Sequence, residues 1–352
     1  MRYAALPFIF AALIVALLAG LHRAGFNIIG ISNMAGYHGA LMTGSFLGAL
    51  ISLERAIVVK KRYAYLVPIS AALSLPMFYV SPDLGYGLLV ASSAGLVAIM
   101  IWLYYKYNEW HQIIFIVGAA CWLIGNFSIL VGDFYFFAAP WWMLFFLFVI
   151  TAERIELAKF ILIKLKSIAL ITAFLTTAFA SMLLPFHSGG KEILGLGFIG
   201  VSITLLLHDI ARKNIKVRGI HGFSGVAMIL GYMWLFVSGV GMTFLRYSGL
   251  FYDAILHTFF IGFVFSMIFA YGPIILPTIL KKGISVFHPI LYIWLVALHL
   301  GLLIRVVADL SAHTSGRLVA SWIDAISMLC FFLTIGILVI QKGFNKKTSS
   351  SK

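Results

Sequence analysis

Three histidines of this 352-residue sequence lie inside long apolar stretches, where an imidazole can do chemistry. They are His38, His257 and His299. A polar side chain in hydrocarbon needs a partner, and an ionisable residue there is a candidate functional group. Neutral imidazole binds haem iron and copper, and helices of a bundle can present such ligands to one centre. The histidines therefore predict a haem or copper site, and the competing interpretation of each is a hydrogen bond to a nearby backbone or hydroxyl group.

A methionine and two glycines follow the first of these histidines. Met42 lies four residues after His38, so both side chains share one helix face. A thioether there is a second soft ligand or packs around a flat macrocycle, and most methionines in membranes only pack. Gly39 and Gly44 leave room for a large planar group beside the backbone. We expect His38 and Met42 to line one cofactor surface.

The composition places these residues in a membrane protein. Hydrophobic residues make up 62% of the chain and charged residues 10%, whereas a soluble domain has about 25% charged residues. The formal net charge of +14 comes from 25 Lys and Arg in short clusters between apolar runs. Such clusters indicate membrane orientation rather than a nucleic-acid partner. We predict one all-α transmembrane domain over residues 1–341 and a disordered basic tail over residues 342–352.

Twelve stretches of the sequence are long enough to cross a bilayer, which takes about 20 apolar residues each. The predicted spans are 4–22, 35–57, 63–81, 85–105, 111–131, 136–155, 167–185, 192–210, 222–245, 253–277, 287–307 and 318–340. If the N-terminus is cytoplasmic, 20 of the Lys and Arg lie on the cytoplasmic side and 5 on the other. Cytoplasmic loops collect these residues. Both termini are therefore expected in the cytoplasm, and the three histidines in the outer half of the membrane.

Two arginines on the outer side are candidate partners for haem propionates. Arg23 ends the first predicted span, and Arg305 follows His299 on the eleventh. Arginine holds carboxylates through two parallel hydrogen bonds. An ion pair of Arg305 with Asp309, four residues further on, explains that arginine equally well.

Other patterns have two interpretations each. Leu53-Glu54-Arg55-Ala56 and Ala152-Glu153-Arg154 end the second and sixth predicted spans, which suggests either an internal duplication or interfacial ion pairs. Pro273 and Pro277 predict a kinked or unwound stretch that lines a substrate or proton path, or else a helix end. A broken helix is also typical of secondary transporters. The span centres, however, contain almost no charged residues for a transported solute.

Two segments resemble a known family. Tyr37-His38-Gly39-Ala40-Leu41-Met42, followed by a glycine-rich helix, resembles the His-Ala-His-Glu-Met segment of NnrS proteins, with Ala40 and Leu41 in place of the second His and the Glu. His257-Thr-Phe-Phe-Ile-Gly262, with Met267, resembles the other histidine helix of that family. NnrS proteins are haem- and copper-containing polytopic membrane proteins linked to nitric oxide metabolism. The resemblance implies His38 and His257 as haem or metal ligands. The His38-Gly39-x-x-Met42 pattern is also similar, more weakly, to the haem-ligand helix of haem-copper oxidase subunit I.

The sequence thus predicts a multi-pass protein of the cell membrane that binds haem, with copper as a second candidate metal, in nitric oxide response or respiratory redox chemistry. Besides the lipid bilayer, the expected partners are a small gaseous or redox ligand and, as a further candidate, a protein of the respiratory chain. The rival hypothesis is a secondary transporter of a small solute with structural histidines. Whether the protein is an enzyme and how it oligomerises are not predicted.

Overall fold

The structure is a computed structural model that describes residues 5–132, 134–158, 165–245, 249–279 and 286–349. The described residues form an all-α protein, in which twelve helices are long and apolar enough to cross a membrane. The chain divides into two compact units, Met1–Glu156 and Leu157–Lys352. Six candidate spans belong to each unit, and the sixth ends at the boundary between the units. The predicted fold class and number of spans are therefore confirmed.

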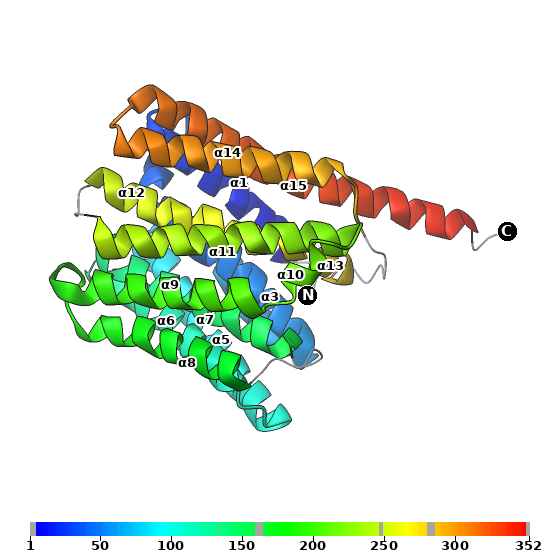
Figure 1. Ribbon diagram of the computed structural model, residues 1–352. Coiled ribbons are helices and arrows are strands. Elements are labelled where there is room, and N and C mark those ends of the chain that lie inside the picture. The colour runs from blue at the N-terminus through cyan, green and yellow to red at the C-terminus, as the bar shows by residue number, and fades with distance from the viewer. Residues whose placement is uncertain (1–4, 133, 159–164, 246–248, 280–285, 350–352) are drawn as a thin grey trace. The chain divides into compact units, whose positions relative to one another are not determined.

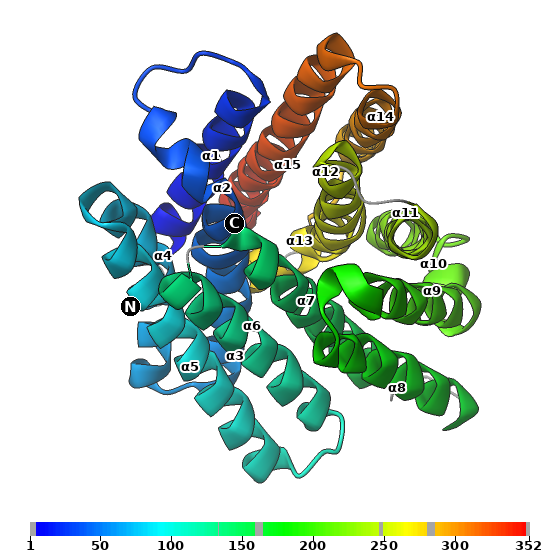
Figure 2. The same cartoon turned by 90° about the vertical axis from the view of Figure 1, so that its left-hand side faces the viewer.

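The first unit contains the spans up to residue 157. Its helices are α1 (Ala5–Ala24), α2 (His38–Ala40), α3 (Ala49–Val59), α4 (Leu66–Val80), α5 (Pro82–Tyr107), α6 (Gln112–Gly132) and α7 (Tyr135–Ala158). A π-helical segment, Leu41–Gly48, joins α2 and α3 into one span. Helices α4, α5 and α6 lie side by side in chain order (Figure 2). The core of this unit includes the fully buried Trp122 and Phe145, whose rings stack with centroids 5.1 Å apart.

Local sequence sets the helix ends in this unit. α5 begins with Pro82, a position where the missing N–H has no partner to lose. It ends before Asn108, which takes the left-handed conformation (φ 50°) common after a helix. α3 ends in the same way before Lys60 (φ 60°). These ends keep the connections short, so that consecutive helices pack as neighbours.

The second unit contains the remaining six spans. Its helices are α8 (Leu165–Ala180), α9 (Lys191–His208), α10 (Ala211–Asn214), α11 (Ile220–Phe244), α12 (Gly249–His257), α13 (Ser266–Ile279), α14 (Ile290–Leu310) and α15 (Thr314–Ser349). A π-helical segment, Thr258–Phe265, joins α12 and α13 into one span. Figure 1 shows α8, α9 and α11 running side by side, and α14 pairs with α15. Apolar stripes on α14 and α15 face each other and leave their other sides exposed.

The predicted boundaries differ from the observed ones by a few residues. The largest difference at the start of a span is in the eighth, which runs over Phe186–His208 rather than 192–210. The predicted disordered tail also differs, because α15 continues to Ser349, and only residues 350–352 of that tail lie outside the described residues. The tail contains no proline, and Gly343 costs a helix only about 1 kcal/mol. The polar composition of the tail therefore does not end the helix.

The irregular backbone lies upstream of the two prolines. Pro273 and Pro277 both fall inside α13, which is an α-helix from Ser266 to Ile279, so the unwinding expected there is absent from this described stretch. The departure from α-helical geometry is instead the π-helical segment Thr258–Phe265. π-helical turns occur often at functional sites. Two of the three π-helical segments in the candidate spans follow a histidine of the predicted site: Leu41–Gly48 begins three residues after His38, and Thr258–Phe265 begins immediately after His257. The third, Phe186–Gly190, lies at the start of the eighth span.

Candidate functional site

His38 is held by a backbone carbonyl of α1. Its Nδ1 lies 2.7 Å from the carbonyl oxygen of Ala16. A carbonyl oxygen only accepts hydrogen bonds, so Nδ1 is assigned as the donor, and the lone pair of the neutral ring lies on Nε2. The ring packs directly against Gly20, where an added Cβ would lie 2.7 Å from Cε1 of His38. Helix α1 therefore fixes both the tautomer and the plane of this imidazole.

Neutral hydroxyl and aromatic groups surround the backbone next to His38. A Cβ added at Gly39 would lie 3.1 Å from the ring of Tyr135. The hydroxyl oxygens of Tyr135 and Tyr86 are 2.7 Å apart, which is a hydrogen bond. Thr43 donates to the carbonyl of Gly39 at 2.8 Å, and this bond ties the first turn of the π-helical segment to the residue after His38. The immediate setting of His38 thus contains aromatic rings and hydroxyls.

The other residues predicted beside His38 lie in the same unit. Arg23 is exposed in the last turn of α1 and is close enough to Tyr135 for an electrostatic interaction. Met42 is half-buried in the π-helical segment that follows His38. Arg23 is therefore accessible to an anionic group at the end of the unit where His38 lies.

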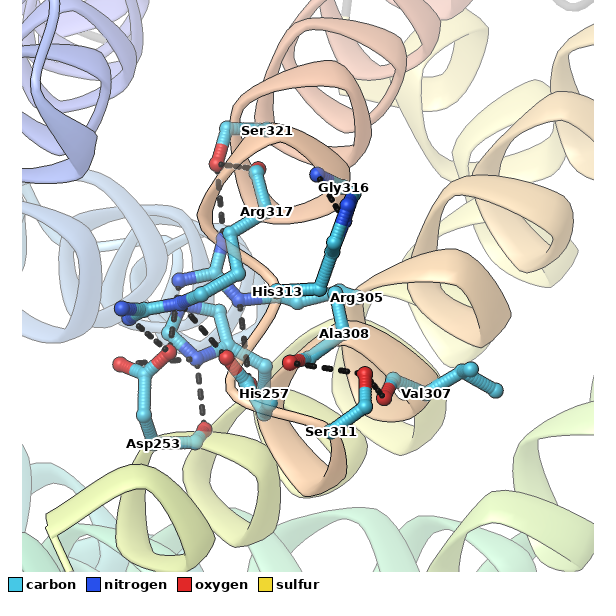
Figure 3. Close-up of polar contacts among 11 residues, drawn as sticks. Asp253, His257, Arg305, Val307, Ala308, Ser311, His313, Gly316, Arg317 and Ser321 are labelled. Atoms are coloured by element: carbon cyan, nitrogen blue, oxygen red, sulfur yellow. Dashed lines mark hydrogen bonds and ion pairs between the residues drawn. The ribbon is translucent and has the colours of Figure 1, made fainter.

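His257 is held in the same way, but by its own helix. Its Nδ1 lies 2.7 Å from the carbonyl oxygen of Asp253, one turn earlier in α12, so Nδ1 is again the donor and Nε2 carries the lone pair. The Asp253 carboxylate is also near, with Oδ1 3.5 Å from Nδ1 (Figure 3). Histidines that bind metals usually donate their other ring N–H to a carboxylate or a backbone carbonyl. The side chain of His257 is 20% exposed, which leaves part of the ring accessible.

An ion-pair network links His257 to the paired helices α14 and α15. Arg305 and Arg317 contact Oδ2 of Asp253 at 2.8 and 3.2 Å (Figure 3). Arg305 also donates to the hydroxyl of Ser321 at 3.0 Å, and Ser321 donates to the carbonyl of Arg317 at 2.8 Å. Arg317 lies 2.6 Å from Asp309, whose side chain is fully buried. We call these five residues, together with His257, the α12–α15 network.

The network changes the interpretation of Arg305. The sequence offered two roles, a propionate partner or an ion pair with Asp309 one turn further on. In the structure the expected ion pair with Asp309 is present at 4.0 Å, but the closest carboxylate is that of Asp253 on α12, at 2.8 Å. Spacing along one helix could not find a partner 52 residues earlier in the chain. Arg305 therefore orients the aspartate that supports His257, and its role toward a propionate stays a prediction.

His299 has a different hydrogen bond from the other two histidines. The indole Nε1 of Trp234 donates to Nδ1 of His299 at 2.9 Å. Nδ1 is thus the acceptor, and the hydrogen of the neutral ring lies on Nε2. Nε2 is buried and has no hydrogen-bond partner within the described part of the chain. Ligation through Nε2 would require the Trp234 bond to be lost, so His299 as a ligand stays a prediction.

The nitrogen atoms of these histidines fit the axial positions of haem iron better than a site in which three protein side chains bind one metal ion. His38 belongs to the first unit, and His257 and His299 belong to the second. Across the residues that the structure describes, no group of three or more His, Cys, Asp or Glu could hold a metal ion. Haem iron takes one or two axial ligands from the protein, and a histidine with its lone pair on Nε2 suits that role. Copper stays a prediction for which these residues supply no ligand cluster.

The two Glu-Arg motifs meet at the far end of the first unit. Arg55, which is 5% exposed, donates to Glu153 at 2.6 Å and lies 3.5 and 3.6 Å from Glu54 and Glu156. Its guanidinium also stacks on Phe115, 4.4 Å from the ring centroid. The ion-pair interpretation of these motifs is therefore confirmed.

One buried acid was missed at the sequence level. Asp324 lies on α15, inside the predicted span 318–340, and is 3% exposed. Neither of its carboxylate oxygens has a hydrogen-bond partner among the described residues. The available signal was a single aspartate between Ile323 and Ala325 in an otherwise apolar run. The sequence predicted that the spans contain almost no charged residues near their centres, and Asp324 is an exception to that prediction.

Comparison with known proteins gives a single finding. A family model described as a domain of unknown function, DUF8744, matches residues 2–340. No curated protein and no solved structure matches the chain.

Proposed function

We propose that this chain, which belongs to the DUF8744 family, is a multi-pass protein of the cell membrane that binds haem, with His38 as the ligand in the first unit and His257 as the ligand in the second. One observation carries the proposal. Each histidine donates Nδ1–H to a backbone carbonyl at 2.7 Å, within three residues of the start of a π-helical segment, and so carries its lone pair on Nε2. Histidines that bind metals usually donate their other ring N–H in this way. The resemblance of both segments to NnrS proteins supports the same residues.

The proposed surroundings of the haem follow from the residues near each histidine. Arg23 is the propionate partner that we propose in the first unit, because it is exposed and carries a guanidinium. Met42 packs along the same face as His38. In the second unit, Asp253 supports His257 and is itself held by Arg305 and Arg317. We propose His299 as a further ligand and copper as a further metal.

The proposed role is nitric oxide response or respiratory redox chemistry, in the outer half of the membrane and with both termini in the cytoplasm. Haem held by histidine supplies one-electron redox chemistry and a binding position for small gases. The distribution of 20 Lys and Arg against 5 supports the orientation, which puts His38 and His257 near the outer surface. The proposed partners are the lipid bilayer, a small gaseous or redox ligand, and a respiratory-chain protein.

The direct test is a reduced-minus-oxidised optical spectrum of the protein purified in detergent from haem-replete cells, together with iron and copper analysis. We expect a Soret band and near-stoichiometric iron. His38→Ala and His257→Ala should each reduce the bound haem, whereas His208→Ala, at the exposed end of α9, should not. A colourless and iron-free protein, or full haem retention in both variants, would contradict the proposal.

A second candidate function is a secondary transporter of a small solute with structural histidines, and Asp324 favours it. Intramembrane carboxylates are characteristic of proton-coupled pumps and transporters. The colourless outcome of the spectrum would make this the leading hypothesis. Solute uptake into vesicles driven by a pH gradient, lost in Asp324→Asn, would then identify the activity.

A further inference from the structure

The α12–α15 network and Asp324 together contain more negative than positive groups. The carboxylates are those of Asp253, Asp309 and Asp324, and the guanidiniums are those of Arg305 and Arg317. With His257 neutral, the group has one negative charge in excess. An uncompensated charge away from water is costly, and a group in that situation neutralises by binding a proton. The set of residues is therefore balanced when it holds one proton.

Asp324 is the residue best placed to hold that proton. The guanidiniums of Arg305 and Arg317 contact Asp253, Asp309 and Ser321, while Arg305 acts on Asp324 only electrostatically. Asp324 is 3% exposed, and both of its oxygens lack a hydrogen-bond partner in the described parts of the chain.

The facing helix leaves space for the carboxyl group of Asp324. Gly301 on α14 lies opposite, and a Cβ added there would be 2.2 Å from Oδ1 of Asp324. Gly301 is one turn before Arg305 on α14, and Asp324 is three residues after Ser321 on α15. The carboxyl group of Asp324 therefore lies about one turn further along the two helices, away from the connecting turn, than the ion pairs. A glycine at this position makes room for a carboxyl group that receives no hydrogen bond. That arrangement suits a neutral, protonated acid better than a paired carboxylate.

The other titratable groups near α15 are tyrosine and histidine side chains. In their neutral forms they do not balance the excess negative charge. Helix α13 also packs against α15, and Tyr271 is its only titratable residue. Helix α14 adds His299, whose Nδ1 accepts the hydrogen bond of Trp234. His313, in the turn between α14 and α15, accepts from the backbone N–H of Gly316 at 3.0 Å (Figure 3). The proton is therefore assigned to Asp324, whose carboxylate oxygens have no hydrogen-bond partner among the described residues.

We infer that Asp324 is a proton-binding site, which takes up and releases one proton. The proton enters at the end of the α12–α15 network where Asp253 and Arg317 lie, because their side chains are 27% and 30% exposed. The inference does not depend on haem, since it rests on the buried carboxyl group of Asp324 and on the space that Gly301 leaves for it.

The experiment is infrared difference spectroscopy of the detergent-purified full chain as a function of pH, which detects the carbonyl stretch of a protonated carboxyl group. We expect a band in the wild type that decreases as the pH rises and that is missing from Asp324→Asn, so that it appears in the difference between the two spectra. Asp83→Asn, which removes an exposed aspartate at the start of α5, should leave the band unchanged. In Asp324→Glu the band should persist at a shifted frequency, which tests the assignment even if the amide variant does not fold.

Three results would overturn the inference: no protonated carboxyl band in the wild type, no difference between the wild-type and Asp324→Asn spectra in that region, or a difference band that sodium removes at constant pH. The last result would identify Asp324 as a cation site rather than a proton site. Each of these readings is made without a cofactor in the sample. Failure of the haem proposal is therefore seen in the optical spectrum, and failure of this inference in the infrared spectrum.

Discussion

The two units hold equivalent histidines by different means. In the first unit, packing and a neutral hydrogen bond fix His38. A backbone carbonyl of α1 accepts the hydrogen bond of its Nδ1, and the ring packs directly against Gly20. In the second, His257 lies beside Asp253, which two arginines hold. The strongest charge cluster of the first unit, around Arg55, is at the opposite end of the span that carries His38.

This difference predicts which substitutions each site tolerates. A site fixed by packing responds to changes of volume, because interiors are close-packed and a misplaced methyl group forces a shift. A site fixed by buried ion pairs responds to changes of charge, because removing one partner leaves the other without compensation. We therefore expect the first unit to be sensitive at Gly20 and the second at Arg305.

The largest effect is expected for Arg305→Ala in the second unit. The substitution removes the closer of the two guanidiniums that contact Asp253, and breaking a buried pair typically costs about 3–5 kcal/mol. Arg218→Ala, an exposed arginine of the same unit, should change stability little. The measurement is the unfolding free energy of the detergent-solubilised protein.

The double variant Asp253→Asn/Arg305→Ala sharpens this prediction. Because both sides of the pair are removed, it should recover part of the stability lost in Arg305→Ala alone. Simple addition of the two single effects would mean that the 2.8 Å contact between these residues does not stabilise the fold.

A smaller effect is expected for Gly20→Ala in the first unit. The new methyl group would lie 2.7 Å from Cε1 of His38, and overpacking of this kind costs about 1–3 kcal/mol. The displaced ring should also lose the Ala16 hydrogen bond, so we expect less bound haem as well as a lower melting temperature. Gly87→Ala is the matched control, because an added Cβ there meets nothing within 4 Å. Wild-type haem content in Gly20→Ala would argue against His38 as a ligand.

Trp234→Phe tests the third histidine. The change removes the donor to Nδ1 of His299 and leaves a largely buried acceptor unsatisfied, at a cost of about 1–2 kcal/mol. We expect the haem content to be unchanged, since His299 already uses its lone pair in this hydrogen bond. A loss of haem in Trp234→Phe and in His299→Ala would instead establish His299 as a ligand.

The sequence was sufficient for the twelve spans, because each is a run of apolar residues of the length that a bilayer requires. It also singled out His38, His257 and His299, since imidazoles inside apolar spans are rare, and their roles as ligands stay predictions. It did not predict the helical end of α15, where polar residues continue a helix that apolar residues began. Composition thus predicts what lies in the membrane more reliably than where a helix ends.

The supporting residues could not be predicted, because their partners are distant in the chain. The Arg305 contact with Asp253 spans 52 residues, and that of Trp234 with His299 spans 65. Spacing rules apply within one helix, so they offered Asp309 as the partner of Arg305 and no partner for His299. The tautomer of each histidine, which decides whether Nε2 can bind a metal, depends on these tertiary contacts alone.

The smallest effect is expected for Tyr135→Phe, which removes one neutral hydrogen bond near His38. The hydroxyls of Tyr135 and Tyr86 are 2.7 Å apart, and a net hydrogen bond of this kind contributes about 1 kcal/mol. We expect that loss in the unfolding free energy and no change in haem content, since the ring that packs against Gly39 is kept. Tyr105→Phe, at an exposed tyrosine, is the control. If Tyr135→Phe destabilised the protein as much as Arg305→Ala, the first unit would depend on polar contacts as strongly as the second, and the contrast between packing and charge would fail.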